Sequence, residues 1–367
     1  MTDNTLKPDE SIFRFLFASP ARFVGECSGE AFYMSPAFPN LTIRPNPIGS
    51  GSRFVLSIRG EARTKKKIVV ENYYWLGEEI SALLGAFFGK LIQNLGHMQS
   101  GSIHHVPMAC DPSATHDPHR LPFNSEPRKP NGPKLNLSEA AGIVEEYVAC
   151  RNRSIPDDGF ACIVRAAEFY RIALESFHTR PDISFSMFCS TLEALLPLRE
   201  YSEDELYDPS LKSILESVSN HCPKGDAMAR NLKARLHQIR RRVALFVSDY
   251  VPDTYFEERE AGVQGLVAQD REDLISRIKC AYDLRSKVLH TGDRSGRWYL
   301  QHDHDRSEIG SGEPMLDDKD LKKTLVGSLT ITGMERVTST VLRTVVAERL
   351  KKRDASQNEE DRPANRS

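Results

Sequence analysis

The chain has 367 residues, more than one ordinary core needs, so its length favours two domains. Apolar residues make up 40% and charged residues 27% of it, the balance of a globular protein with a sizeable core. With 49 Lys and Arg against 51 Asp and Glu, the formal net charge of −2 excludes a uniformly basic nucleic-acid coat and an acidic tail protein.

Residues 11–75 consist of short runs rich in Phe, Val, Ile and Tyr, with Pro and Gly between them. The runs IFRFLF, RFVLSIRGEA and KIVVENYYW are typical of β-strands, and the breaks are typical of turns. Residues 76–95 then change to the helical period with a wide apolar face. We therefore predict a β-rich N-terminal domain over residues 1–95 that closes with a helix.

The rest of the chain reads as a connection, a helical domain and a tail. Residues 96–135 are rich in Pro, Gly, His and Asn without periodicity, and we interpret them as an interdomain linker. Residues 136–352 have helical periodicity, whereas residues 353–367 have the composition of a disordered tail. The expected helices cover 137–150, 159–178, 182–198, 210–221, 227–248, 269–291 and 317–352. The predicted fold class is α+β, with the β-rich domain followed by an all-α bundle.

Two further features concern the surroundings in which the protein acts. The longest mostly apolar run, residues 80–95, contains Lys90 and is shorter than the roughly 20 residues of a membrane span. No cationic, apolar leader opens the chain, so we expect neither a membrane span nor a secretory signal. The seven cysteines are scattered and never form a Cys-x-x-Cys pair, which predicts reduced thiols in a cytoplasmic protein.

The expected helix over residues 270–291 has the most distinctive chemistry. Arg285 falls in the middle of its apolar stripe, so the guanidinium must be paired, line a polar groove or reach out of the core. His290 follows at the C-terminal end, where the helix dipole favours a protonated imidazole. An Arg and a His with four residues between them suit metal-free RNA cleavage, in which one stabilises the pentacoordinate phosphate and the other moves protons.

Spacing alone does not select this pair, because the chain has other Arg and His residues at similar separations. Context selects it: AYDLRSKVLHTG, residues 281–292, resembles the closing motif of the HEPN superfamily, an Arg followed after four to six residues by His. FSMFCSTLEALLPL, residues 185–198, resembles the helix that precedes this motif in the Apea-like HEPN branch. Helix 160–178 lies where that branch has its first long helix. The resemblance covers roughly residues 155–350 and does not extend to residues 1–135.

The resemblance implies a helical bundle that pairs with a second bundle as a homodimer, bringing two Arg/His sets together in a positively charged cleft. It further implies a metal-independent endoribonuclease without a cofactor, with Arg285 and His290 as the catalytic pair. The residue after the Arg is often Asn, Asp or His in active members, and here it is Ser286, a weaker polar helper. Glu193 is the candidate partner of Arg285, either in an active site or in a buried structural ion pair.

The geometry of an ideal helix limits this prediction. Residues five apart point about 140° away from each other around the axis. Arg285 and His290 therefore converge only if the helix unwinds near Leu289 or if a second protomer completes the site.

Segment 227–248 holds six basic residues, no acidic residue and a clean apolar stripe. A basic amphipathic helix of this kind is either a solvated face or a surface that contacts RNA phosphates. The side chains that we expect to contact RNA are Arg230, Lys233, Arg240, Arg241 and Lys287.

Histidines suggest a metal site at two places, without a strong ligand signature at either. They gather with Cys110 between His97 and His119, and again in the HDHD sequence at residues 302–305. Imidazole with thiolate or carboxylate can hold Zn²⁺, but polar loops collect histidines readily. We therefore predict no metal. Glycine-rich phosphate-binding loops and Gly-x-Ser-x-Gly are also absent from the sequence.

The leading hypothesis is a metal-independent endoribonuclease in anti-phage or stress defence. It would cleave single-stranded or structured RNA, with transfer RNA as one candidate, and leave a 2′,3′-cyclic phosphate. The N-terminal domain would sense a trigger that the sequence does not identify. The alternative is a non-catalytic HEPN module that binds nucleotide, RNA or a protein partner through the same groove. A third hypothesis is a metal-dependent hydrolase that uses the histidine loop.

Overall fold

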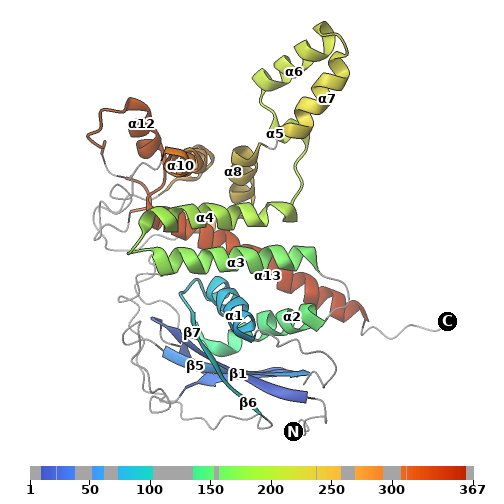
Figure 1. The fold of residues 1–367 in the computed structure, drawn as a ribbon, viewed down its shortest axis with the longest axis vertical. Coiled ribbons are helices and arrows are strands. Elements are labelled where there is room, and N and C mark those ends of the chain that lie inside the picture. The colour runs from blue at the N-terminus through green and yellow to red at the C-terminus, as the bar shows by residue number, and fades with distance from the viewer. Residues whose placement is uncertain are drawn as a thin grey trace, which may run out of the picture.

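A β-sheet at one end of the molecule lies beneath layers of helices (Figure 1). This is the predicted α+β class with a β-rich N-terminal part. The computed structural model describes residues 10–21, 23–37, 52–61, 73–101, 135–152, 157–236, 238–257, 269–291, 307–310 and 312–360.

The sheet is antiparallel and has the strand order β3-β4-β5-β1-β6. Its strands are β1 (Glu10–Ser19), β3 (Cys27–Ser28), β4 (Phe32–Pro36), β5 (Ser52–Glu61) and β6 (Gln93–Gly101). In β1, which lies between β5 and β6, Phe13, Phe15 and Phe17 share one face because successive side chains of a strand point to opposite faces, and all three belong to the hydrophobic core. A short parallel pair joins β2 (Phe23–Val24) to β7 (Leu135–Asn136).

The closing helix of the N-terminal part is shorter than predicted. Helix α1 (Tyr73–Phe88) ends at Gly89, which has a φ of +63°, so the helix expected over 76–95 does not continue. The run KIVVENYYW was expected to be a strand, yet its last three residues begin α1, and the rest of the run lies outside the described residues.

Strand β6 also takes residues 96–101, which the sequence assigned to the linker. Its polar residues and a break in register near Gly96 hide the alternation that marks a strand. Residues 102–134 of the expected linker lie outside the described residues.

Helices account for most of the described chain after β7. They are α2 (Ala141–Asn152), α3 (Asp158–Ser176), α4 (Pro181–Leu195), α5 (Glu203–Leu206), α6 (Pro209–His221), α7 (Gly225–Arg235), α8 (Ile239–Tyr250), α9 (Thr254–Glu257), α10 (Arg271–Thr291), α12 (Lys319–Gly327) and α13 (Ile331–Glu360). The short 3₁₀ helices η3 (Leu137–Ala140) and η4 (Leu196–Leu198) precede α2 and follow α4.

Two expected helices are each divided into two. The helix predicted over 227–248 breaks before Gln238, whose φ of +46° is left-handed, so that α7 packs on α6 while α8 packs on α10 and α13. The helix predicted over 317–352 breaks before Thr330, whose hydroxyl accepts the Gly333 amide at 2.9 Å as a helix cap.

The last helix extends further than predicted. Helix α13 continues to Glu360, into the segment 353–367 that we expected to be disordered, and residues 361–367 lie outside the described residues. The helical period is difficult to recognise there because the segment has charged and amide side chains on every side.

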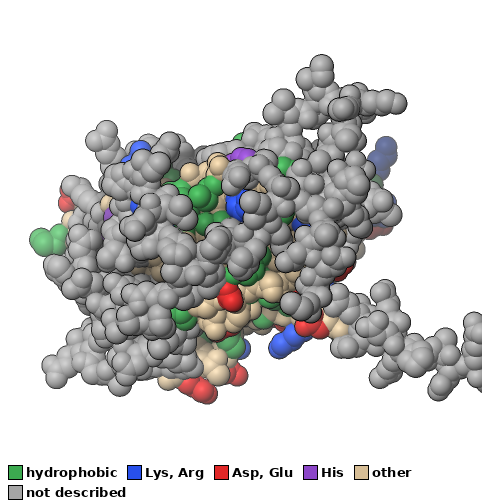
Figure 2. All heavy atoms as spheres, turned by 90° about the horizontal axis from the view of Figure 1, so that it is seen from below, with side chains coloured by type: hydrophobic (Ala, Val, Ile, Leu, Met, Phe, Trp, Pro, Cys, Tyr) green, Lys and Arg blue, Asp and Glu red, His purple; other side chains and the backbone are tan. Residues whose placement is uncertain are grey.

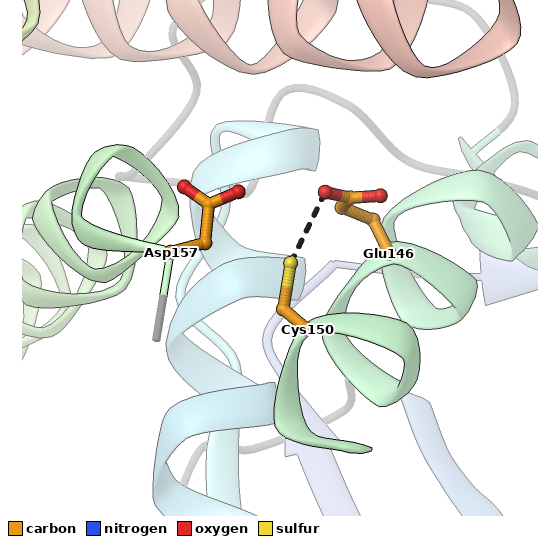
Figure 3. A group of neighbouring side chains, drawn as sticks. All are labelled: Glu146, Cys150 and Asp157. Carbon is orange, nitrogen blue, oxygen red and sulfur yellow. Dashed lines mark hydrogen bonds between the residues drawn. The ribbon is translucent and has the colours of Figure 1, made fainter. Parts of the chain in front are cut away.

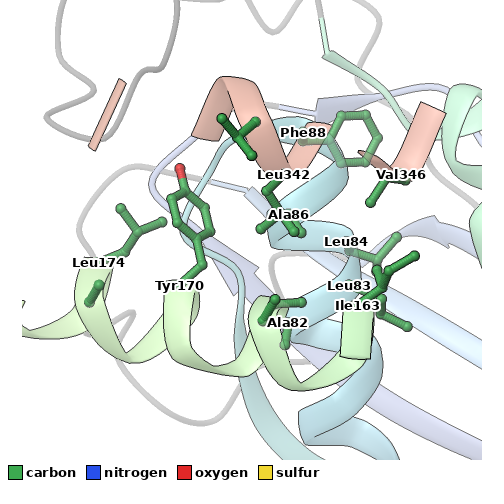
Figure 4. Packing of buried hydrophobic residues seen from close by; sticks show 14 of the residues in the cluster. Ala82, Leu83, Leu84, Ala86, Phe88, Ile163, Tyr170, Leu174, Leu342 and Val346 are labelled. Atoms are coloured by element: carbon green, nitrogen blue, oxygen red, sulfur yellow. The ribbon is translucent and has the colours of Figure 1, made fainter. Parts of the chain in front are cut away.

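The sheet and the helices share one hydrophobic cluster. Figure 4 shows its centre, where α1, α3 and α13 meet through side chains such as Phe88, Ile163 and Leu342. At this contact the hydroxyl of the buried Tyr170 donates to Glu335 of α13 at 2.8 Å. Helix α4 packs on α3 and α13, and α10 lies on the side away from the sheet, against α4, α8 and α12 (Figure 1).

The start of α10 is fixed by a buried carboxylate, Glu308. This side chain accepts hydrogen bonds from the Gln269 amide at 2.7 Å and from the Tyr255 hydroxyl at 3.1 Å. It also pairs with Arg336 of α13 at 3.3 Å, and both members of the pair are almost fully buried. Because losing one partner would leave a buried charge, this contact holds α10 firmly to the rest of the bundle.

The charged side chains on the sheet side of the molecule are scattered. Seen from below in Figure 2, the described Lys, Arg, Asp and Glu side chains do not gather into a patch of one sign. Within the described ranges, every helix is too short or too polar to cross a membrane.

Candidate functional site

The predicted contact between Arg285 of α10 and Glu193 of α4 is present. Arg285 Nη1 donates to Glu193 Oε1 at 2.7 Å and to the hydroxyl of Tyr282 at 3.1 Å. Its Nη2 lies 3.4 Å from the hydroxyl of Ser190, also on α4. Two helices therefore hold one guanidinium by three polar contacts.

Tyr282 is a part of this site that the sequence analysis missed. Its hydroxyl donates to Glu193, and its ring lies 5.4 Å from the guanidinium carbon of Arg285, within cation–π range. Burial, and next the hydrogen bond to Glu193, raise the pKa of Tyr282 above its usual value, so the hydroxyl keeps its proton. The sequence contained an indication of this contact, because Tyr282 and Arg285 are three residues apart and such residues are neighbours on the surface of a helix.

The site lies at the boundary between the core and the surface. The side chains of Arg285 and Glu193 are 18% and 25% exposed, while Leu274 and Ile278 on the same helix are buried. The guanidinium thus sits in the apolar stripe, as predicted, and it is paired there. Its Nε is buried and has no hydrogen-bond partner in the described part of the chain. Beneath it, burial raises the pKa of Cys189 to about 12, so this thiol stays protonated.

His290 lies on the same helix as Arg285 but at a different angle. The backbone of α10 remains helical to Thr291, so the helix does not unwind near Leu289 and that way of bringing the two residues together is wrong. On a continuous helix the two positions are about 140° apart, so Arg285 and His290 can meet only if a second protomer supplies one of them. The side chain of His290 lies outside the described residues.

Ser286 does not reach the guanidinium. Its position is about 100° from Arg285 around the helix, and within the described residues the guanidinium bonds Glu193, Tyr282 and Ser190 instead. Ser286 instead shares a stripe of α10 with Lys279, Asp283 and the His290 position, at spacings of four, three and four residues.

The residues predicted to contact RNA do not form one basic face. Lys233 of α7 pairs with Glu203 at 2.5 Å, and Arg240 of α8 pairs with both carboxylate oxygens of Asp283 at 2.8 Å. Of the other three residues predicted to contact RNA, Arg241 donates from its Nε to the Glu205 carbonyl at 2.6 Å. Arg230 on α7 is exposed, and Lys287 on α10 is half-buried.

A smaller group of cations lies where α8 packs on α10. Burial, followed by the charges of Arg241 and Arg240, lowers the pKa of Lys279, so these three side chains lie close enough to repel each other. We refer to Lys279, Arg240 and Arg241 as the cation group. The sequence analysis missed Lys279 because it belongs to a different helix from the two arginines.

A different cluster has the residue types of a metal site, but an arginine neutralises it. Glu146, Cys150 and Asp157 offer ligand atoms within 4.8 Å of one another. Figure 3 shows the hydrogen bond that the Cys150 thiol donates to Glu146. Arg349 of α13 lies 2.5 Å from Glu146 and 2.6 Å from Asp157, and the two carboxylates help to raise its pKa. Burial opposes that increase. A metal ion would have to displace this guanidinium, so the cluster is an ion-pair network that joins α2, α3 and α13.

The predicted histidine loop falls almost entirely outside the described residues. Of its members only His97 is described, in β6, where its ring lies 6.4 Å from that of Phe13 and 5.6 Å from that of Phe15. The side chain of His97 is exposed, with these two rings on one side of it. The HDHD segment at 302–305 also lies outside the described residues.

The geometry of α4 and α10 is therefore the main support for any functional assignment. The HEPN resemblance of residues 155–350 stays a prediction, because it rests on two short motifs. No family model, no curated protein and no solved structure matches the chain.

Proposed function

We propose that the chain is a metal-independent endoribonuclease of the HEPN type whose site is built on α4 and α10. The observation that carries the proposal is the fixed guanidinium of Arg285, which Glu193 and Tyr282 hold at the edge of the core. Burying an arginine in an apolar stripe costs folding free energy unless partners satisfy its charge, and an apolar side chain would pack there without that cost.

Arg285 has the chemistry that the transition state of RNA cleavage requires. A guanidinium is a cation with planar donors that match phosphate oxygens. Because Glu193 and Tyr282 hold it in place, little reorganisation is needed when negative charge develops on the phosphorane.

His290 supplies the proton transfer in this proposal. It takes the proton of the 2′-hydroxyl as the 2′-oxygen attacks phosphorus and returns a proton to the 5′-oxygen as the P–O5′ bond breaks, which leaves the 2′,3′-cyclic phosphate. The helix C-terminus beside it favours the protonated imidazole. Since its position diverges from that of Arg285, each complete site takes Arg285 from one protomer and His290 from its partner in a homodimer.

The cation group is suited to contact the RNA backbone. Lys279 lies on the same stripe of α10 as the His290 position, and the two arginines of α8 lie beside Lys279. Phosphates bound there would approach the stripe that carries the histidine. Each phosphate contact adds to the salt dependence of binding.

A second function is favoured by the same ion pair. Glu193 already neutralises Arg285, as in a structural bridge that only holds α4 to α10. A non-catalytic HEPN module that binds nucleotide, RNA or a protein partner would need no more than this. An Arg285→Ala variant that folds and still binds its partner or protects cells would favour this second function.

Induced expression tests the nuclease proposal in cells. We expect wild type to stop growth and to leave discrete RNA fragments, and Arg285→Ala and His290→Ala to do neither. Arg277→Ala is the matched control, since Arg277 lies on the same helix and its side chain is equally exposed at 18%. RNA fragments that persist unchanged in Arg285→Ala would contradict the proposal.

A further inference from the structure

The cation group lies where α8 packs on α10, and one carboxylate bonds it (Figure 1). That carboxylate is Asp283 of α10, whose two oxygens both accept from Arg240 Nη1 at 2.8 Å. Arg241 donates instead to the backbone carbonyl of Glu205, which carries no formal charge. Within the described residues, Lys279, Arg240 and Arg241 therefore meet one bonded carboxylate.

A second carboxylate lies near the cation group, but it has another role. Asp208 favours the charged form of Lys279 through its own charge. Its side chain also accepts the Leu211 amide at 2.8 Å and so caps the start of α6. Because this cap occupies Asp208, Asp283 is the carboxylate that decides how much of the cation group is neutralised.

The contact between Asp283 and Arg240 is built to be exchanged. The two side chains are 41% and 52% exposed, so another anion can approach the guanidinium from solvent. Both carboxylate oxygens share one nitrogen of Arg240, which is not the two-nitrogen fork of the strongest arginine–carboxylate pairs. Exposed ion pairs of this kind contribute little to stability, so replacing the carboxylate costs little.

The position of Asp283 on α10 relates this contact to the proposed active site. Asp283 follows Lys279 by four residues and precedes the His290 position by seven, on the same stripe of the helix. A chain of phosphates that runs from Lys279 towards His290 must therefore pass Asp283. There it meets a carboxylate of its own sign.

A nucleic-acid strand is the anion best able to replace Asp283. A guanidinium binds a phosphate as readily as a carboxylate. A polyanion also gains free energy when condensed counterions are released, which a carboxylate of the protein or a single small anion does not. The exchange therefore favours an RNA strand over free phosphate.

We propose that Asp283 competes with RNA from within the protein: its carboxylate occupies Arg240 in the free chain, and a backbone phosphate replaces it when RNA binds. The inference rests on the proposed function, because it takes RNA as the substrate and adds a restraint on its binding. The restraint raises the RNA concentration at which the site fills. A ribonuclease that would otherwise cut the RNA of its own cell benefits from such a restraint.

Fluorescence anisotropy with a 2′-O-methyl RNA strand tests this proposal on the full chain. The strand lacks the attacking 2′-hydroxyl, so it stays intact while binding is measured. Asp283→Asn should bind it about threefold to fivefold more tightly, because Arg240 is freed and the repulsion of the phosphate is removed. Asp283→Ser should do the same, and circular dichroism should show that both variants fold.

The matched control is Asp273→Asn, which changes the net charge by the same amount. Asp273 lies on the same helix, about 15 Å from Asp283, and pairs with Arg277 at 3.5 Å. This variant should bind RNA as wild type does. In an Arg240→Ala background, the gain from Asp283→Asn should fall below about twofold, because the guanidinium that the carboxylate occupies is absent.

Three results would overturn the proposal: no gain in Asp283→Asn, an equal gain in Asp273→Asn, or the same gain with and without Arg240. These results leave the nuclease proposal standing as long as wild type binds RNA. A wild type that binds no RNA would overturn the proposed function, and this inference with it.

Discussion

The bond between Arg285 and Glu193 should contribute about 2 kcal/mol of coupling energy to stability. Exposed ion pairs contribute about 0–1 kcal/mol, whereas breaking a fully buried pair costs about 3–5 kcal/mol. At 18% and 25% exposure the pair lies between these limits, and the Tyr282 hydroxyl shares the carboxylate. Glu193→Gln and Arg285→Met should each destabilise the protein by about 2 kcal/mol, because each leaves a charge without its partner.

The double variant separates this coupling from the cost of each substitution. Methionine suits the apolar stripe around position 285, so Glu193→Gln with Arg285→Met should cost about 2 kcal/mol less than the sum of the single changes. The assay is equilibrium urea unfolding of all four proteins. A coupling energy below about 0.5 kcal/mol would refute the claim that Glu193 holds Arg285.

A control cycle uses the contact between Arg240 of α8 and Asp283 of α10. Arg240 and Asp283 are bonded at 2.8 Å but are 52% and 41% exposed, so solvent screens their attraction. The same cycle on this pair should give no more than about 0.5 kcal/mol. Equal coupling in the two cycles would show that burial does not set the strength of the Arg285 contact.

Three further predictions concern pH, subunit exchange and salt. Burial raises the pKa of Glu335, so the stability it contributes is present at low pH and is lost as the pH rises through its folded value. The melting temperature of Glu335→Gln should therefore rise relative to that of wild type as the pH increases, and a difference independent of pH would contradict this. If sites are shared between protomers, mixing the inactive Arg285→Ala and His290→Ala proteins should restore about a quarter of wild-type cleavage, because half of the dimers are mixed and each has one intact site. No recovery after proven exchange would place both residues in one chain. Lys279→Ala should weaken RNA binding and reduce its salt slope by about 1, measured by fluorescence anisotropy, and an unchanged slope would remove Lys279 from the interface.

The sequence predicted the elements whose periodicity is strong. The run IFRFLF lies within β1, and the apolar helices at 159–178 and 182–198 match α3 and α4 within a few residues. The HEPN resemblance also offered Glu193 as the candidate partner of Arg285, and the structure shows that contact.

The features that were missed depend on tertiary packing. The break at Gln238 arises because α7 and α8 pack on different neighbours, and an amphipathic pattern continues across such a break. The cation group joins two helices that are far apart in sequence, so no local motif contains it. Strand β6 is polar, and the sheet rather than its own sequence fixes it as a strand.

The exposed apolar residues of α7 were also missed. Within the sequence, Met228 and Leu232 look like ordinary core positions of an amphipathic helix. Only the structure shows that α7 has α6 on one side and no described element over these two residues. The pattern predicted burial for these two residues, and the structure leaves both exposed.

The most direct test of the account is cleavage of RNA by the purified full chain in the presence of a chelator, with the ends of the fragments mapped. The account predicts fragments with 2′,3′-cyclic phosphate and 5′-hydroxyl ends from wild type and from Arg277→Ala. It predicts no fragments from Arg285→Ala or His290→Ala. Fragments with 3′-hydroxyl ends, activity that the chelator abolishes, or equal cleavage by Arg285→Ala would contradict it.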